Sequence, residues 1–429
     1  MKIAYLTSEY PAPSHTFIRR EVAALRSMGV DIDTFSIRRP TPSARLSGED
    51  EAAAAETAYV LESVPRILGS ALIEFVRAPV RTLVTFVAAL RHRVPGLRAA
   101  IWACFHFLEA MQLVRLLRAR KVVHLHNHFA NSSAIVGMLA ARHLGIGFSL
   151  TIHGISEFDG PAGALLPEKI RACRFAACVS AFGRAQVMRM VEPAEWSKLF
   201  ISRCGLSTRG RPKHVEVEGR LRFCSVGRLS PEKGHVGLFE AFRAVLAAGI
   251  DADLHLVGDG PMRCELETWR SALGLDERIH FLGQLTEEEV AKTIADADVF
   301  VLSSFMEGLP VVIMEAFAAG VPVVAPGVAG IPELVVHRET GLLFPPSDWE
   351  ALADAMVTMA SDPGLRARLA ERGRRRVAEQ HEITRAVRPL LDQLASMGLV
   401  SLEREGERTG KKRRIDVLEL DAEIATSPL

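Results

Sequence analysis

The sequence predicts an α/β protein of two doubly wound parallel-sheet domains that face one another across a cleft. The chain has 429 residues, more than a single hydrophobic core usually holds. Strand-like apolar runs alternate with helical segments in both halves, which is the order expected of parallel strands joined by crossover helices. The polar, proline-containing stretch STRGRPKHVEVEGR, residues 207–220, separates the halves and is the predicted domain boundary.

Four parts follow from this boundary. They are a first domain at 1–210, a second domain at 211–385, a C-terminal helix at 386–400, and a disordered tail at 401–429 that contains the KKRR tract.

The first half contains strand-like runs with helices between them. The runs are KIAYLTS, DIDTFSI, VVHLHNHF, FSLTIHG and AACVS. A helix is expected from about 17 to 28, and Gly29 ends it. Residues 41–60 are rich in Ala, Ser and Glu and are expected to form a mobile loop, whereas residues 63–121 are expected to be helical.

The second half is more regular. Its predicted strands are RFCSVG, ADLHLVG, IHFLG, VFVLSS and VPVVAP, and its predicted helices follow Gly234, Pro261, Gln284 and Leu309. Ligands of doubly wound sheets bind at the carboxyl ends of the strands, so the loops that follow these strands are the candidate sites.

Composition narrows the class of protein. The net charge is +1, so no global field points to nucleic acid, and the six cysteines contain no CxxC pair, which favours reduced thiols in a cytosol. The N-terminal apolar run is too short for a secretory signal. The best candidate membrane span, residues 67–90, is interrupted by Glu74, Arg77, Pro79 and Arg81, so we expect a cytoplasmic chain that touches a membrane without spanning it.

Two loops in the second half carry weak signals of phosphate binding. VGRLSPEKG places Arg228 and Lys233 before a helix, where cations and free N–H groups attract phosphate, although a charged surface loop is the alternative. LVGDGPMR has a Gly-x-Gly after a strand, with Gly258 first. A dinucleotide fingerprint needs a third glycine, and a tight turn before a helix explains the pattern equally well.

The third loop, SSFMEGLPVVIMEAFAAGVPVVAP, is the most informative. Pro310 can begin a helix and Gly320 can end it, which gives about two and a half turns. Glu307 precedes this helix, and Glu315 lies within it among apolar residues. A buried carboxylate needs a partner, which is either a ligand or a salt bridge to Arg228 or Lys233.

This third loop resembles the Glu-x7-Glu signature of retaining glycosyltransferases of family 4, which have the GT-B fold of two facing Rossmann-like domains. The string EGLPVVIMEAFAAGVPVVAPGVAGIPELV carries the resemblance, and VGRLSPEKG, LVGDGP and FLGQL occur in the family's order and spacing. The resemblance is close over about 221–385 and looser over 1–206. YPAPSHTFIRREVAALRSMGV, HNHF and LTIHG are similar to members that build exopolysaccharides such as colanic acid.

The resemblance implies a role for each matching residue. Arg228 and Lys233 hold the donor diphosphate, Glu315 binds the ribose, and Glu307 contacts the sugar. The remaining implied donor contacts are Gly258, Gly308, Leu309 and Val311 near sugar or phosphate, Leu282 and Gly283 near the nucleobase, and His153 across the cleft. The implied catalytic residues are Glu307, His153, Arg228 and Lys233. The resemblance also implies no metal or other cofactor, a nucleotide sugar substrate with UDP favoured, and no dedicated protein base.

The acceptor side is less well marked. Ser14, His15 and His128 are its candidates, but the loop SEYPAPSH lacks the glycines of many relatives, and Ser207 stands where many have an acidic residue. His124, His126 and His128 alternate on one strand, as metal ligands can, yet no acidic or cysteine ligand is near them in sequence. We therefore expect no metal site there.

Residues 63–121 carry ten basic residues against Glu74 and Glu109, which suits an anionic membrane surface and a polyprenyl-linked or glycan acceptor. Solvated arginines on packed helices are the alternative. The first functional hypothesis is an exopolysaccharide or lipid-linked glycosyltransferase. The others are an enzyme that makes a soluble disaccharide and a non-catalytic scaffold that binds sugar nucleotides. An NAD-dependent dehydrogenase is weaker, because the glycine fingerprint is incomplete.

Overall fold

The computed structural model describes residues 1–12, 15–41, 46–208, 214 and 219–400, and it contains two parallel sheets. The seven-stranded first sheet has the order β3-β2-β1-β4-β5-β6-β7. Its strands are β1 (Ile3–Glu9), β2 (Ile32–Arg38), β3 (Ala58–Tyr59), β4 (His124–His128), β5 (Gly147–Ile152), β6 (Ala176–Cys178) and β7 (Leu199–Ile201). All of its neighbouring strands pair in parallel, as the alternation of strands and helices predicts.

The six-stranded second sheet has the order β10-β9-β8-β11-β12-β13. Its strands are β8 (Leu221–Val226), β9 (Ala252–Val257), β10 (Ile279–Gly283), β11 (Val299–Val301), β12 (Val323–Pro326) and β13 (Gly341–Phe344). In each sheet the order reverses beside the first strand, between β1 and β4 and between β8 and β11. Ligands of such sheets bind at this point.

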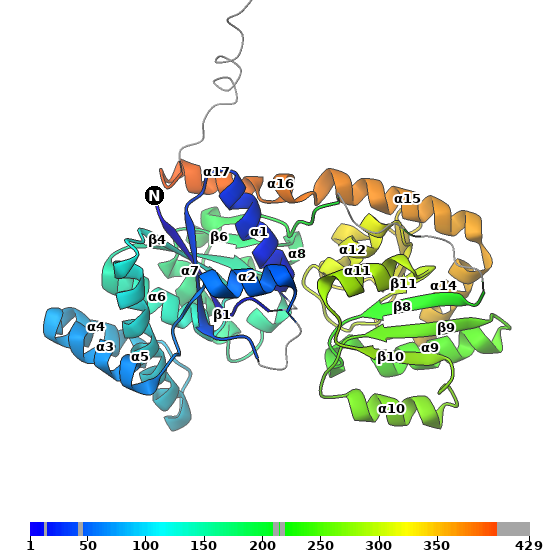
Figure 1. The fold of residues 1–429 in the computed structure, drawn as a ribbon, viewed down its shortest axis with the longest axis horizontal. Coiled ribbons are helices and arrows are strands. Elements are labelled where there is room, and N and C mark those ends of the chain that lie inside the picture. The colour runs from blue at the N-terminus through cyan, green and yellow to red at the C-terminus, as the bar shows by residue number, and fades with distance from the viewer. Residues whose placement is uncertain (13–14, 42–45, 209–213, 215–218, 401–429) are drawn as a thin grey trace, which may run out of the picture.

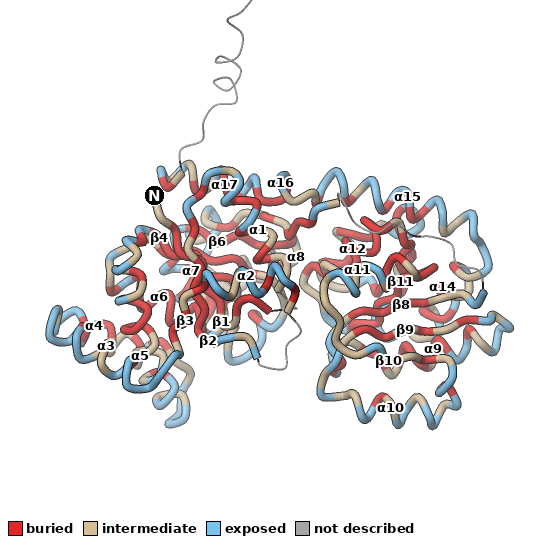
Figure 2. Tube along the Cα trace, viewed as in Figure 1, coloured by how far each residue is buried: buried red, intermediate tan, exposed pale blue. Residues whose placement is uncertain are grey.

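Helices cover both sheets (Figure 1). The first domain has α1 (Thr16–Ser27), α2 (Gly48–Glu56), α3 (Val64–Arg77), α4 (Pro79–Arg91), α5 (Leu97–Ala119), α6 (Ser132–Leu144), α7 (Leu166–Ala172) and α8 (Ala181–Met190). The second has α9 (His235–Ala247), α10 (Arg263–Ala272), α11 (Glu287–Ala295), α12 (Val311–Ala319), α13 (Ile331–Leu334), α14 (Trp349–Ser361) and α15 (Pro363–Gln380). The strands and their packed helices are the buried parts of both domains (Figure 2).

The C-terminal helices return to the first domain. After α15, the short α16 (Ile383–Ala386) and α17 (Arg388–Ser396) lead back across the molecule (Figure 1). Leu390, Leu391 and Leu394 of α17 are buried in a core cluster that also contains Ile3 and Ile18. The helix expected at 386–400 therefore follows the second domain in sequence but packs into the hydrophobic core of the first.

The prediction of a loop over 41–60 was wrong for 48–56. This segment is α2, and the side chain and backbone of Ser47 exchange hydrogen bonds with Asp50 in a capping box. Residues 42–45, most of the expected boundary at 207–220 and the expected tail at 401–429 lie outside the described residues. Sequence reasoning also missed the short strands β3, β7 and β13.

Helix α5 passes a length and composition test for a membrane span among the described residues. It has 23 residues, and its most apolar window has a mean hydropathy of 1.3 and is 39% buried. This differs from the expectation that charges exclude every such segment. Core helices of soluble proteins pass the same test, and Leu113, Val114 and Leu117 of α5 are fully buried in the first domain.

Candidate active site

A cleft of about 850 Å³ lies between the two domains. The start of α1 and the loop after β1 line its first-domain side through Thr16, Phe17 and Glu9. The loops after β8, β9, β10 and β11 line the opposite side. Seven residues predicted from sequence line this cleft, namely Arg228, Lys233, Gly258, Glu307, Leu309, Val311 and Glu315.

Lys233 and Glu307 form an ion pair at the centre of the second-domain edge. Lys233 Nζ lies 2.6 Å from Glu307 Oε1, and the Ser304 hydroxyl donates to the same oxygen at 2.7 Å. The backbone continues this link, because the Ser303 hydroxyl donates to the Lys233 carbonyl at 2.8 Å. The loops after β8 and β11 are thus one unit that fixes the ammonium group at the cleft.

The glycines of the second loop allow the loops to pack against one another. A β-carbon on Gly258 would lie 1.9 Å from the Gly227 carbonyl oxygen, and one on Gly260 would lie 2.4 Å from that of Leu229. Gly258 also has a φ of 131°. The Gly-x-Gly pattern is therefore explained by loop packing that holds Arg228, an exposed side chain, at the cleft wall.

Helix α12 points its N-terminus at the cleft. It runs from Val311 to Ala319 with Pro310 as N-cap and Gly320 as a left-handed C-cap, as the sequence predicts. Pro310, Val311 and Val312 line the cleft. The first N–H groups of a helix lack partners within the helix, and its dipole is positive at this end. This edge therefore presents two cations and a helix N-terminus to an anion.

Glu315 has a partner that the sequence did not predict. The carboxylate is buried, and its Oε1 accepts from Arg20 of α1 in the other domain at 2.7 Å. The sequence left open a ligand or a protein partner and suggested Arg228 or Lys233. The structure shows a protein partner on the other domain, while Lys233 pairs with Glu307. Arg20 also bonds Glu287 of α11. Burial opposes the charge on Arg20, but Glu315 and Glu287 outweigh it and raise its pKa above the ordinary value.

The two domains touch through glycine backbones beside the cleft. A β-carbon on Gly308 would lie 2.1 Å from the His153 carbonyl oxygen, and one on Gly154 would lie 3.6 Å from the Gly308 Cα. The end of β5 and the start of the α12 loop thus meet directly. A larger residue at 308 would force the domains apart.

His153 lies behind this contact and does not line the described cleft. Its Nε2 is 2.9 Å from His128 Nδ1, and its ring packs against Phe17 and Phe129 with centroids 4.8 and 4.6 Å apart. Burial lowers the pKa of His153 well below its ordinary value. The imidazole is therefore neutral near pH 7 and is held by aromatic rings one layer from the cleft.

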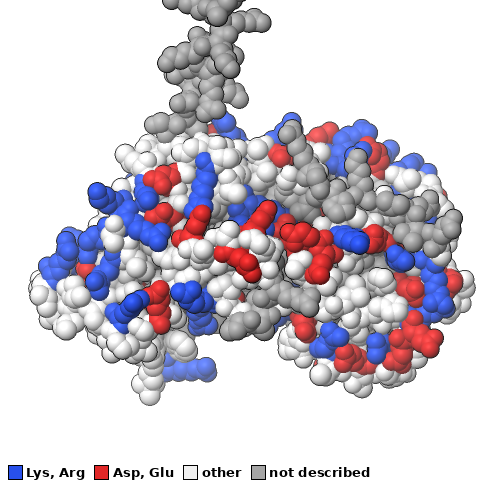
Figure 3. All heavy atoms as spheres, viewed as in Figure 1, with Lys and Arg blue, Asp and Glu red and all other residues white. Residues whose placement is uncertain are grey.

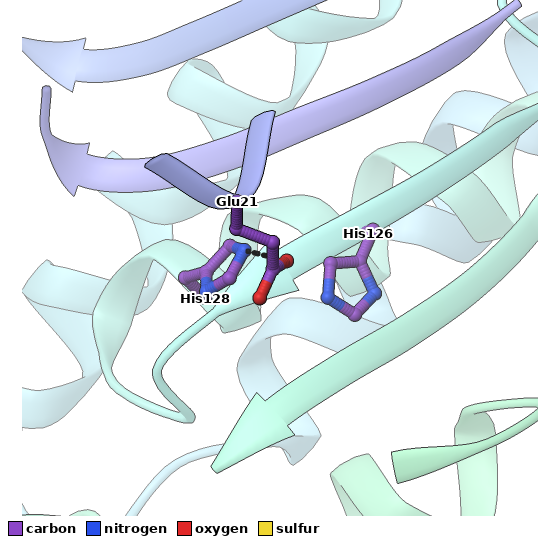
Figure 4. A group of neighbouring side chains, drawn as sticks. All are labelled: Glu21, His126 and His128. Atoms are coloured by element: carbon purple, nitrogen blue, oxygen red, sulfur yellow. Dashed lines mark ion pairs between the residues drawn. The ribbon is translucent and has the colours of Figure 1, made fainter. Parts of the chain in front are cut away.

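Two histidines of β4 gather with Glu21 of α1 below the cleft (Figure 4). Their ligand atoms lie within 4.8 Å of one another, so this group could hold a metal ion. However, His126 bonds Ser149 and Thr151 through its two ring nitrogens, each at 2.8 Å, and Glu21 accepts from Tyr5 at 3.1 Å. These donors and acceptors form a hydrogen-bond network, and a metal would have to displace them.

Glu157 is a buried residue that sequence reasoning missed. Its Oε2 accepts from the backbone N–H groups of His153 and Gly154 at 2.6 and 2.8 Å, and it also accepts from the Ala130 N–H. Burial raises the pKa of Glu157 to about 7, against these hydrogen bonds. This carboxyl fixes the backbone at the end of β5, where the two domains meet.

Of the remaining predicted residues, some lie beside the cleft and others lie behind its surface. Leu282 and Gly283 lie one step before Gln284 and Leu285, which line the cleft in their place. His15 packs its ring against Phe129 at 4.9 Å, and His128 is fully buried behind the surface. Ser14 lies outside the described residues. Sequence reasoning missed Arg20, Phe17 and Glu157. Arg20 bonds a residue of the second domain, and Phe17 and Glu157 contact segments of the first domain that are distant in sequence.

Comparison with known proteins identifies this arrangement. Residues 207–376 match the family model of glycosyl transferases group 1. The putative colanic acid biosynthesis glycosyltransferase WcaL of Salmonella typhimurium is 29% identical over 91% of this chain and 99% of the relative. The chain is a glycosyltransferase, and its residues 207–376 are similar to the group 1 family.

One further relative by sequence and two solved structures are similar to the chain. The amylovoran biosynthesis glycosyltransferase AmsK of Erwinia amylovora is 31% identical to the glycosyltransferase over 42% of this chain and 46% of the relative. HepE of Anabaena, solved in complex with UDP and glucose, has a TM-score of 0.71 at 17% identity and covers 92% of this chain and 100% of its own. Sucrose-phosphate synthase of Thermosynechococcus elongatus has a TM-score of 0.70 at 21% identity with the same coverage. The fold of the glycosyltransferase is GT-B.

Proposed function

We propose that the glycosyltransferase moves a sugar, with retention of configuration, from a nucleoside diphosphate sugar to a growing glycan or polyprenyl-linked acceptor in cell-surface polysaccharide synthesis. UDP is the proposed nucleotide, and family 4 the proposed class. One observation carries the proposal: Arg228, Lys233 and the N-terminus of α12 converge on the cleft beside Glu307 and Glu315. This set matches a ligand with a diphosphate, a sugar and a ribose.

The charges suit the leaving group. As the bond between the sugar C1 and the phosphate oxygen breaks, negative charge develops on the diphosphate and positive charge on the sugar ring. Arg228, Lys233 and the helix N–H groups are placed to stabilise the departing diphosphate, and groups fixed before the reaction need little reorganisation. These cations supply the role that a metal has in other transferases, so we propose a metal-free reaction.

The proton and the new bond must also be accounted for. In the proposed step the acceptor oxygen bonds C1 on the face that the phosphate leaves, and its proton passes to the departing phosphate oxygen. The products are the glycoside and the nucleoside diphosphate. Glu307 would accept from a sugar hydroxyl in place of Ser304, and Glu315 would accept from the ribose hydroxyls in place of Arg20.

The acceptor class is drawn from the relatives. Proteins named for colanic acid and amylovoran biosynthesis are similar to this chain, the former over nearly its whole length. Both names refer to polysaccharide synthesis, and UDP is the ligand in structures of the same fold. A cytoplasmic site of action follows from the proposed donor, since nucleotide sugars are made in the cytosol.

The experiment is a donor panel. UDP, GDP, ADP and dTDP sugars are incubated with the enzyme and a polyprenyl-diphosphate sugar or a short glycan, with EDTA present. We expect one nucleotide to support transfer, and nuclear magnetic resonance of the product to show the donor's anomeric configuration. An inverted product would contradict retention. Transfer that stops on adding EDTA would contradict the metal-free step.

A further inference from the structure

Helix α3 is amphipathic with its two faces reversed relative to a soluble protein. Its buried side carries one apolar residue, Ile67, together with Ser70 and Glu74, and Glu74 is bonded by Arg118 at 2.8 Å. Its outer side carries apolar residues, and Leu68, Leu72 and Val76 at i, i+4 and i+8 are 52%, 64% and 76% exposed. Folding in water alone would place these side chains inward.

Helix α4 repeats this reversal, and the first half of α5 adds exposed apolar residues beside it. Thr82 and Thr85 of α4 are buried, and their hydroxyls bond the carbonyl oxygens of Glu74 and Arg81. The exposed apolar residues of α4 and α5 are Val80, Leu83, Val84, Val87, Leu97, Ile101, Trp102 and Phe105. The three helices contact one another and lie at the end of the first domain away from the second (Figure 1). An exposed apolar surface of this size marks a binding face.

Within 63–121 the exposed charge has one sign, and Glu62, just before α3, pairs with Arg66. Exposed arginines accompany the apolar face at positions 66, 77, 81, 91, 98 and 115. The acidic residues of 63–121 are Glu74, which is buried, and Glu109, whose pKa burial raises to about 7. Blue side chains gather over this end of the molecule, whereas red ones concentrate nearer the second domain (Figure 3).

A recess of about 490 Å³ lies where α3 meets α4. Arg77, Arg81 and Arg118 line it, beside Val80, which is 75% exposed. Guanidinium groups bind phosphate oxygens in pairs, and an apolar side chain next to them suits an acyl chain. A lipid headgroup meets both conditions at once.

We propose that the outer face of α3, α4 and the first half of α5 inserts into the interface of an anionic bilayer. Leucine, valine and tryptophan side chains enter the acyl boundary, and the surrounding arginines bind lipid phosphates. The apolar side chains of this face point outward because the hydrocarbon of the bilayer, rather than water, covers them. This inference is independent of the donor chemistry proposed above, because no residue of the cleft takes part.

Vesicle flotation tests it with the full chain. We expect binding to vesicles of phosphatidylcholine with 30% phosphatidylglycerol, at least tenfold weaker binding to phosphatidylcholine alone, and weaker binding as salt rises. Brominated lipids should quench Trp102, and Trp102→Phe should remove that quenching. A chain that floats with neither vesicle overturns the proposal.

Matched variants test the apolar residues and the arginines of this face separately. Leu72→Ser, Val76→Ser and Val80→Ser together, and separately Arg77→Gln with Arg81→Gln, should each reduce binding at least tenfold. Trp269→Ser, at a 39% exposed apolar residue of the second domain, should bind as the unmodified chain does.

Light scattering tests whether a second copy of the chain, rather than a bilayer, covers this face. A dimer that the serine variant dissociates, without vesicle binding, would overturn the proposal. An unchanged circular dichroism spectrum and thermal midpoint would confirm that each variant is folded.

Discussion

The two edges of the cleft are held in place by different kinds of contact. On the second-domain edge Lys233 is paired with Glu307 within the domain, and glycine loops hold this pair in place. On the first-domain edge Phe17, Phe129 and His153 form an aromatic layer, and Arg20 reaches over to Glu315. The donor edge is organised before any ligand arrives, whereas the facing edge depends on how the domains meet.

This difference predicts where a substitution acts. Changes on the donor edge should remove nucleotide binding and catalysis without altering the interface. Changes on the facing edge should alter transfer or stability while leaving nucleotide binding intact.

The largest effect is expected for Lys233→Ala. Loss of the ammonium removes a fixed charge from the leaving diphosphate, which should lower kcat about 10²–10³-fold. Initial rates of transfer measure it. Lys292→Ala, at an exposed lysine of α11, is the matched control and should keep full activity. Equal activity in the two variants would remove Lys233 from the site.

Glu315→Ala should weaken UDP binding about 10–100-fold, because a hydrogen bond to a charged group contributes about 1.5–3 kcal/mol. Isothermal titration measures the Kd. Arg20→Ala tests the competition with ribose for the same carboxylate, since Arg20 must release Glu315 when the nucleotide binds. We expect UDP affinity in Arg20→Ala to equal or exceed that of the unmodified chain. A drop as large as that of Glu315→Ala would make Arg20 a nucleotide contact.

The histidines of the first-domain sheet should make stability depend on pH. Burial lowers the pKa of His124 to about 4, so its contribution is complete above about pH 6.5 and is lost as the pH falls toward 4. At pH 5 the loss from His124 is about 2 kcal/mol. Urea unfolding at pH 7 and pH 5 measures this difference.

His124→Gln should reduce that pH dependence, whereas His280→Gln, at a partly exposed histidine of the second domain, should not. The slope with pH decides the test, because either variant can shift the absolute stability. An unchanged slope in His124→Gln would show that other groups cause the acid lability.

The smallest effect is expected for His153→Asn. The imidazole lies behind the cleft wall, bonded to His128 and packed on Phe17, so loss of its hydrogen bond should disturb the sugar side only indirectly and lower kcat at most about tenfold. UDP lacks the sugar that is transferred, so its Kd should not change. A parallel loss of UDP binding would show that His153 supports the whole cleft rather than the sugar.

The sequence predicted the donor edge far better than the facing edge. The α12 helix, Lys233, Glu307 and Glu315 belong to contiguous loops at strand ends, so their proximity follows from the topology of a parallel sheet. The partner of Glu315 did not follow, because Arg20 is 295 residues away in sequence and meets it only when the domains close. Glu157 and Phe17 were missed because they contact Ala130, and Phe129 and His153, which are distant in sequence within the first domain.

Two local features of the first domain were also not predicted from the sequence. Helix α2 was missed because it has no apolar face, although its alanines favour a helix and Ser47 and Asp50 carry a capping signal. The reversed faces of α3 and α4 could not be recognised from charge alone, since Glu74 and the threonines look solvent-exposed until their partners Arg118 and His143 are placed. Patterns within one element were predictive, and contacts between elements were not.

The central claim is that the second-domain edge binds a nucleoside diphosphate without a metal. The direct measurement is the thermal shift of the unmodified chain and of Lys233→Ala with UDP, with and without EDTA. At 100 times its Kd, UDP should stabilise the unmodified chain by about 2.7 kcal/mol, equally with EDTA, and should stabilise Lys233→Ala far less. A shift that requires a divalent cation, or an equal shift in both proteins, would contradict the claim.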